Sequence, residues 1–173
     1  MVELMGSYMG MIPMMTLGLM QYSQQWQAAD VFRAAPMPGP APLCHGARKA
    51  VMCVIALPLA CIFAAIAWAV QRDAAQMLLL LPGIVAMPVF GVAAGLNNGG
   101  VPLSMPTEEA KGASRGLMMM GIMMSSFAIS GVAGLAWATG WFHWFMLGEC
   151  VFGAALYAAI HVSLARKPWP QAD

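Results

Sequence analysis

The chain has 173 residues, of which 61% are hydrophobic and 9% are charged, and its mean hydropathy is +0.72. Soluble domains carry roughly 25% charged residues, so this composition excludes an ordinary soluble domain. The formal net charge of +1, with no large basic cluster, excludes a nucleic-acid-binding protein. The sequence therefore predicts an all-α integral membrane protein with a single transmembrane domain over residues 1–173.

Five apolar segments are long enough to cross the hydrocarbon core of a bilayer as helices, which takes roughly 20 residues. They cover Leu4–Tyr22, Ala50–Val70, Met77–Leu96, Leu117–Ala138 and Trp144–Leu164. The first segment lacks the basic start and small-residue cleavage site of a signal peptide, so we expect it to remain as a span. Prolines at positions 13, 58, 82 and 88 predict that several spans are kinked.

Lysine and arginine fall mostly in alternate connections of a five-span protein. The first loop, the third loop and the C-terminal tail share one side of the membrane and contain Arg33, Arg48, Lys49, Lys111, Arg115, Arg166 and Lys167. The opposite side contains only Arg72. Because cytoplasmic loops are enriched in basic residues, we expect the N-terminus outside and the C-terminus in the cytoplasm. The setting expected for such a chain is a bacterial inner membrane.

The first loop, residues 23–49, is the longest polar interruption of the chain. Its first half predicts a short helix that carries Trp26, Asp30, Phe32 and Arg33. Its second half contains four prolines, each of which removes an amide donor, so we expect it not to be helical. Aromatic side chains on a short exposed helix are typical of a docking site for a partner. The alternative is a helix that lies on the lipid headgroups, with Trp26 as its anchor.

The second cytoplasmic loop covers residues 97–116 and begins with Asn-Asn-Gly-Gly, which ends the third apolar segment. Thr107 is a predicted helix N-cap, and Glu108 and Glu109 follow it in the first turn, where the helix dipole favours acidic residues. We therefore expect a short helix over about 107–114, just before the fourth span.

Glu149 is the acid that falls within a predicted span, about five residues inside the fifth. An ionisable group inside the membrane is a candidate functional residue. The alternative is that Glu149 lies shallow enough to reach water near the outer interface.

Methionine is abundant, with 18 residues, and four of them form two Met-x-x-x-Met steps: Met119, Met120, Met123 and Met124. Thioethers are soft ligands that suit Cu(I), so a copper carrier is one hypothesis. The alternative is that methionine only fills apolar space between helices. The adjacent Cys44 and His45 have no second pair to complete a zinc site, and we expect no metal centre.

Motifs for catalysis are missing from the sequence. It contains no GxxxxGK[ST], no HExxH and no GxSxG, and no pair of aspartates lies on the spans. We therefore expect neither enzymatic activity nor a cofactor, and any use of ATP would depend on another subunit.

The passage from Tyr22 to Val51 resembles the cytoplasmic segment of ABC-2-type exporter permeases. In that family a short helix with an aromatic residue and a small-residue pair is followed by a proline-bearing turn and a Gly-x-x-Lys sequence. The matching residues here are Trp26, Ala28-Ala29, Phe32-Arg33, Ala35-Pro36 and Gly46-Ala47-Arg48-Lys49. Pro102-Leu103-Ser104 also resembles a short motif of such permeases.

The resemblance implies export through an oligomeric membrane domain that is driven by a separate ATPase subunit. The family usually has six spans per permease, whereas five are counted here, and this chain begins directly in a span. Both departures suggest the C-terminal portion of a longer permease. The alternative is an accessory subunit of a larger membrane complex, and the copper carrier is a third hypothesis.

Overall fold

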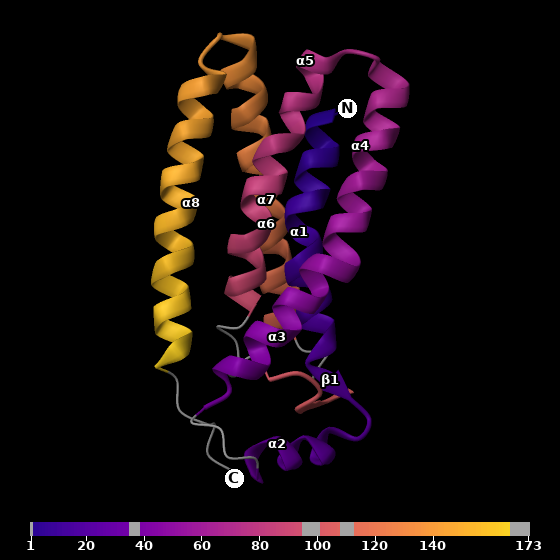
Figure 1. The fold of residues 1–173 in the computed structure, drawn as a ribbon, viewed down its shortest axis with the longest axis vertical. Coiled ribbons are helices and arrows are strands. Elements are labelled where there is room, and N and C mark those ends of the chain that lie inside the picture. The colour runs from indigo at the N-terminus through magenta and orange to yellow at the C-terminus, as the bar shows by residue number, and fades with distance from the viewer. Residues whose placement is uncertain (1, 35–38, 95–100, 108–112, 167–173) are drawn as a thin grey trace.

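The computed structural model describes residues 2–34, 39–94, 101–107 and 113–166, and most of these residues are helical (Figure 1). The main helices run side by side along the long axis of the molecule: α1 (Val2–Met20), α3 (Ala41–Val51), α4 (Leu57–Gln71), α6 (Leu81–Ala93), α7 (Ala113–Ala138) and α8 (Phe142–Ala165). The shorter helices are η1 (Trp26–Ala29), α2 (Asp30–Ala34), η2 (Met52–Ala56), α5 (Ala74–Met77) and η3 (Leu78–Leu80).

Four helical stretches in the described part of the chain are long and apolar enough to cross a membrane. They are Ala41–Gln71, Ala74–Ala93, Met119–Ala138 and Phe142–Ala165, while α1 offers the shorter apolar stretch Leu4–Met20. The prediction of an all-helical protein with the composition of a membrane protein is confirmed. The count of five spans and their orientation remain predictions.

The core of the bundle forms around α1, which packs chiefly against α6 and α7. Its residues Ser7, Met9 and Pro13 are fully buried. In contrast, the most apolar part of α8 has no buried residue, although Phe142 and Leu164 near its ends are covered. A helix with a largely exposed apolar surface is what a lipid-facing position requires.

Two glycines let α1 and α6 approach closely. A Cβ on Gly83 would overlap the carbonyl group of Gly6, with the carbonyl carbon only 2.6 Å away. A Cβ on Gly10 would lie 3.2 Å from Oγ of Ser126 in α7 and 3.6 Å from Cβ of Ala86. Gly6 and Gly10, four residues apart on α1, therefore form a helix-packing surface. Gly91 of α6 packs against Pro13 of α1.

Prolines coincide with changes of helix type. Pro58 follows η2, a π-helical stretch that joins α3 to α4 in one continuous helix. Pro82 follows η3, a 3-10 turn between α5 and α6. Each proline removes a backbone donor, and altered local hydrogen bonding accommodates that loss. Pro13 and Pro88 lie inside α1 and α6.

One prediction for the first loop was wrong. Its proline-rich second half was expected not to be helical, yet α3 begins at Ala41 and includes Pro42 in its first turn. Proline is tolerated there because the first amides of a helix have no intrahelical acceptor. Residues 35–38 lie outside the described residues, as does most of the helix predicted over 107–114; α7 begins at Ala113.

The two loops at one end of the bundle are joined by a short parallel pairing of β1 (Tyr22–Ser23) with β2 (Met105–Pro106). The amide of Leu103 also donates to the carbonyl of Met20 at 2.8 Å, and the amide of Met105 donates to the carbonyl of Gln21 at 3.0 Å. The Pro102-Leu103-Ser104 motif therefore lies directly below α1, with Leu103 at a positive φ of 60°.

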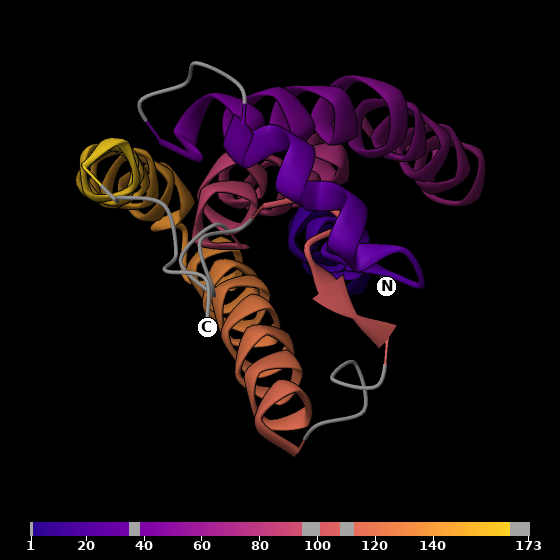
Figure 2. The same cartoon turned by 90° about the horizontal axis from the view of Figure 1, so that it is seen from below.

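The connections alternate between the two ends of the bundle (Figure 1). The N-terminal end of α1 lies at the same end as the α4–α5 and α7–α8 connections. The β1–β2 pair, α2 and the last turn of α8 lie at the opposite end, below the bundle, as the view from below also shows (Figure 2). This is the arrangement expected of a bundle whose helices alternate in direction.

Candidate functional site

The predicted docking residues form a short helical segment at the lower end of the bundle. η1 and α2 together cover residues 26–34, which confirms the predicted helix. Trp26 is 41% exposed, Asp30 is exposed and Phe32 is partly buried. Arg33 belongs to α2, and its side chain is not described. The segment thus offers an exposed aromatic side chain beside the paired strands.

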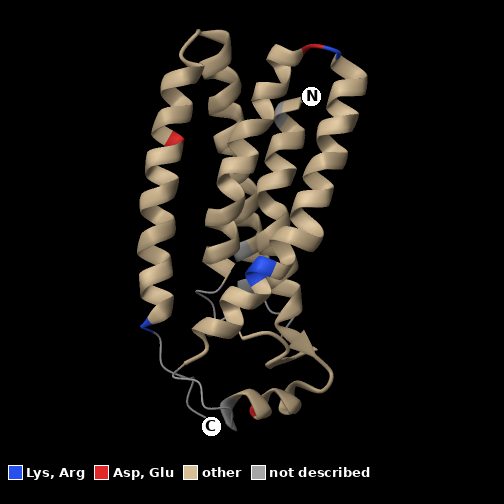
Figure 3. Cartoon of the chain, in the orientation of Figure 1, with Lys and Arg blue, Asp and Glu red and all other residues tan. Residues whose placement is uncertain are grey.

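Glu149 lies in the upper half of α8, far from the docking segment (Figure 3). Both of its carboxylate oxygens are buried, and neither has a hydrogen-bond partner among the described residues. Figure 3 shows it as an isolated acidic residue on a helix that is otherwise free of charge until Arg166. Glu149 therefore does not join any cluster that could form a site with it in the described part of the chain.

The methionines of the copper hypothesis lie mostly on the outside of the bundle. Met120, Met123 and Met124 are 60%, 43% and 66% exposed, and Met119 is partly buried. No group of three or more His, Cys, Asp or Glu in the described ranges is arranged to hold a metal ion. Exposed methionines on an apolar helix suit a surface that faces lipid or packs against another helix, because methionine is a flexible apolar side chain.

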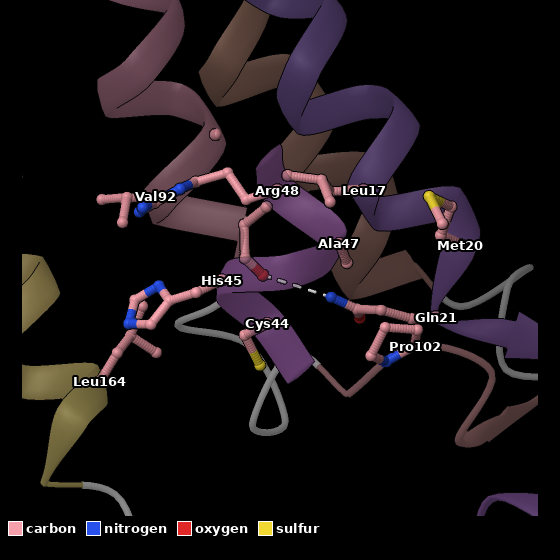
Figure 4. Close-up of a pocket in the computed structure, with 12 residues that line it drawn as sticks. Leu17, Met20, Gln21, Cys44, His45, Ala47, Arg48, Val92, Pro102 and Leu164 are labelled. Carbon is pink, nitrogen blue, oxygen red and sulfur yellow. Dashed lines mark hydrogen bonds between the residues drawn. The ribbon is translucent and has the colours of Figure 1, made fainter. Parts of the chain in front are cut away.

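A cleft that the sequence did not predict lies where α1, α3, α6 and α8 meet, at the lower end of the bundle (Figure 4). Its polar side chains are those of Gln21, Cys44, His45 and Arg48, and the apolar ones include Leu17, Val92 and Leu164. None of the described residues that line it is acidic. The cleft is therefore lined by basic, polar and apolar side chains together.

Aromatic and basic side chains of α3 and α8 stack beside this cleft. The guanidinium carbon of Arg48 lies 5.1 Å from the ring centroid of Tyr157. The Tyr157 and His161 rings are 5.9 Å apart and inclined by 27°, and the His161 and His45 rings are stacked at 4.4 Å with an angle of 13°. We call Arg48, Tyr157, His161 and His45 the Arg48 stack. It joins α3 to α8 through their side chains.

Arg48 differs from its neighbour Lys49 in its environment. Its Nη1 is buried and has no hydrogen-bond partner among the described residues. The stem of Arg48 passes close to Gly91, where a Cβ would lie 3.6 Å from its Cγ. Figure 4 shows the side chain directed from α3 toward Val92. Lys49 is exposed, so the Arg48–Lys49 pair contributes one partly buried and one solvated cation.

Two buried hydrogen bonds hold the ends of α1 in place. Nε2 of Gln21 donates to the carbonyl oxygen of Ala94 at 3.2 Å, beside the cleft. Farther up, Oγ of Ser126 donates to the carbonyl oxygen of Ser7 at 2.6 Å. Polar pairs of this kind between apolar helices fix the position of one helix against another.

Sequence reasoning considered His45 only beside Cys44 and missed the stack. A signal was present, because His45 and Arg48 are three residues apart and Tyr157 and His161 are four apart, so each pair shares one face of its helix. That these two faces meet, more than 100 positions apart in sequence, follows only from the packing of α3 beside α8.

In comparisons with known proteins, no family model, curated protein or solved structure matches this chain. The function is therefore inferred from the residues and their arrangement alone.

Proposed function

We propose that this chain is the membrane permease component of an ABC-type exporter, powered by a separate ATPase subunit that docks on η1 and α2. The observation that supports it best is the short helical segment carrying exposed Trp26 and partly buried Phe32 at the end of the bundle. Its matching sequence from Tyr22 to Val51 resembles the cytoplasmic segment of such permeases. The proposal places five spans in a bacterial inner membrane, with the N-terminus outside.

The β1–β2 pair gives the docking segment a route to the spans. Tyr22 and Ser23 follow α1 directly, and their pairing with Met105 and Pro106 ties the segment to the second loop as well. A partner bound to η1 and α2 would act on α1, the most buried helix, through only a few residues. This is the connection that coupling of ATP hydrolysis to helix movement requires.

Docking is tested by truncating the aromatic side chains. Loss of a central interface aromatic typically costs about 2 kcal/mol or more. Trp26→Ala and Phe32→Ala should therefore weaken association with the candidate ATPase by about 30-fold. Gln27→Ala, an exposed neighbour in η1, is the matched control and should bind normally. The effect of Asp30→Ala should be small and should fade in salt, because exposed charges are screened. Full retention of the ATPase by both aromatic variants would contradict the proposal.

Orientation is tested with single cysteines in a variant that lacks the four native ones. Gln27 and Ala74 are exposed at opposite ends of the bundle. A membrane-impermeant thiol reagent added to intact cells should label Ala74→Cys and leave Gln27→Cys unlabelled until the membrane is opened. The reverse pattern would refute the N-out orientation.

The second candidate function is an accessory subunit that packs against a larger membrane complex. It is favoured by the largely exposed apolar surface of α8, whose most hydrophobic stretch has no fully buried residue. Affinity purification in mild detergent separates the two proposals. Recovery of an ATP-binding cassette subunit supports the exporter, whereas recovery of an intact membrane assembly without such a subunit supports the accessory role.

A further inference from the structure

We propose that the cleft beside the Arg48 stack is a binding site for an anionic phosphate group, and that the ligand is the headgroup of an acidic phospholipid. The proposal requires that the chain lies in a membrane, but it does not depend on the exporter function. It rests on the position of Arg48, the composition of the cleft wall and the level of the cleft in the bundle.

The guanidinium of Arg48 has an unused donor in the described part of the chain. Its guanidinium is held by the Tyr157 ring at 5.1 Å, and Nη1 is buried without a hydrogen-bond partner among the described residues. A buried charged donor that lacks an acceptor carries the full cost of desolvation. An oxyanion in the cleft would remove that cost, and the planar fork of arginine suits two phosphate oxygens at once.

The described residues that line the cleft give it a positive charge. Arg48 and His45 contribute positive or neutral groups, while no acidic residue lines the cleft in the described part of the chain. Among the described residues, no carboxylate therefore lies in the cleft to neutralise Arg48. His161 stacks on His45 and, as a histidine, cannot supply the negative charge of a counter-ion.

The cleft also has apolar lining residues. Leu17, Val92 and Leu164 lie among its polar groups and offer apolar contacts to the hydrocarbon part of a lipid. The cleft lies near the start of the helix Ala41–Gln71, whose 31 residues extend about 46 Å, more than the roughly 30 Å hydrocarbon core. Because the predicted span begins at Ala50, after Arg48 and Lys49, the first turns of this helix are expected at the level of the headgroups. Basic pockets between helices at this level are suited to acidic lipid headgroups.

The test measures lipid retention by the full chain in detergent with native mass spectrometry. Phosphatidylglycerol is the acidic probe, phosphatidylcholine is the zwitterionic control and inorganic phosphate is the soluble competitor. The wild type should bind one phosphatidylglycerol more tightly than any phosphatidylcholine. Arg48→Gln should weaken that binding about tenfold or more, which corresponds to about 1.4 kcal/mol. Lys49→Gln removes the same charge from the exposed neighbour and should bind normally.

Several results would overturn the proposal. Unchanged binding by Arg48→Gln would do so, and so would an equal loss in Arg48→Gln and Lys49→Gln, which would indicate general attraction to a basic surface. If Arg48→Gln fails to fold, Arg48→Lys replaces it. This variant keeps the positive charge but lacks the planar guanidinium fork, so its affinity for phosphatidylglycerol should fall severalfold. Undiminished binding by Arg48→Lys would refute the site. Displacement of the lipid by inorganic phosphate would overturn the lipid assignment and make free phosphate the ligand of the same anion site. None of these results bears on association with the ATPase.

Discussion

The substitution Gly83→Ala tests whether α1 and α6 pack as closely as the structure shows. The added Cβ would lie 2.6 Å from the carbonyl carbon of Gly6, about 1 Å inside the optimal separation of non-bonded carbon atoms. Both contacting groups are backbone, so a change of rotamer cannot relieve the overlap. The two helices must separate, and overpacking of this kind typically costs about 1–3 kcal/mol.

Two other glycines calibrate this effect. A Cβ on Gly6 would meet the carbonyl oxygen of Leu79 at 3.1 Å, so Gly6→Ala should cost less than Gly83→Ala. A Cβ on Gly121 in α7 would have nothing within 4 Å, so Gly121→Ala should be neutral or stabilising by up to about 1 kcal/mol from helix propensity. The free energy of unfolding, measured by titrating sodium dodecyl sulfate into mixed micelles, should be lowest for Gly83→Ala, higher for Gly6→Ala and highest for Gly121→Ala. Equal stability of Gly83→Ala and Gly121→Ala would refute the close approach.

Three further predictions concern buried polar groups and methionines. Ser126→Ala removes the hydrogen bond to the Ser7 carbonyl and should cost about 0.6 kcal/mol in the same assay, as interhelical hydrogen bonds do on average. Gln21→Met leaves the buried Ala94 carbonyl without its donor and should cost about 1–3 kcal/mol, while Gln24→Met on the exposed loop should cost little. Replacing Met119, Met120, Met123 and Met124 together by leucine should leave Cu(I) binding unchanged, and a loss of bound copper would revive the copper carrier.

The sequence predicted the helical elements well because length and hydropathy determine them. Each long apolar segment contains a helix, and Trp26, Asp30, Phe32 and Arg33 fall on the short helical segment expected for them. The error at Ala41 arose because proline was treated as a helix breaker at every position. Pro42 lies in the first turn, where it breaks no hydrogen bond.

The cleft and the β1–β2 pair could not be predicted from periodicity. Both depend on contacts between segments far apart in the chain, such as His45 with His161 and Tyr22 with Met105. Hydropathy separates lipid-compatible from polar segments, but it does not determine which helices are neighbours. Nor does it distinguish a partly buried arginine from the solvated lysine beside it.

The π-helical stretch η2 determines which way Arg48 faces. Upstream of it, Cys44, Arg48 and Val51 are buried or partly buried and follow ordinary helical spacing. The next fully buried residue is Ala56, which comes five positions after Val51 rather than three or four. The stretch thus acts as a one-residue insertion that offsets the first turns of the helix by about 100° relative to an uninterrupted α-helix. Removing one residue between positions 52 and 56 would cancel this offset while keeping every span. The guanidinium of Arg48 would then turn away from α6. The cleft would lose its charge, although the chain would keep all of its basic residues.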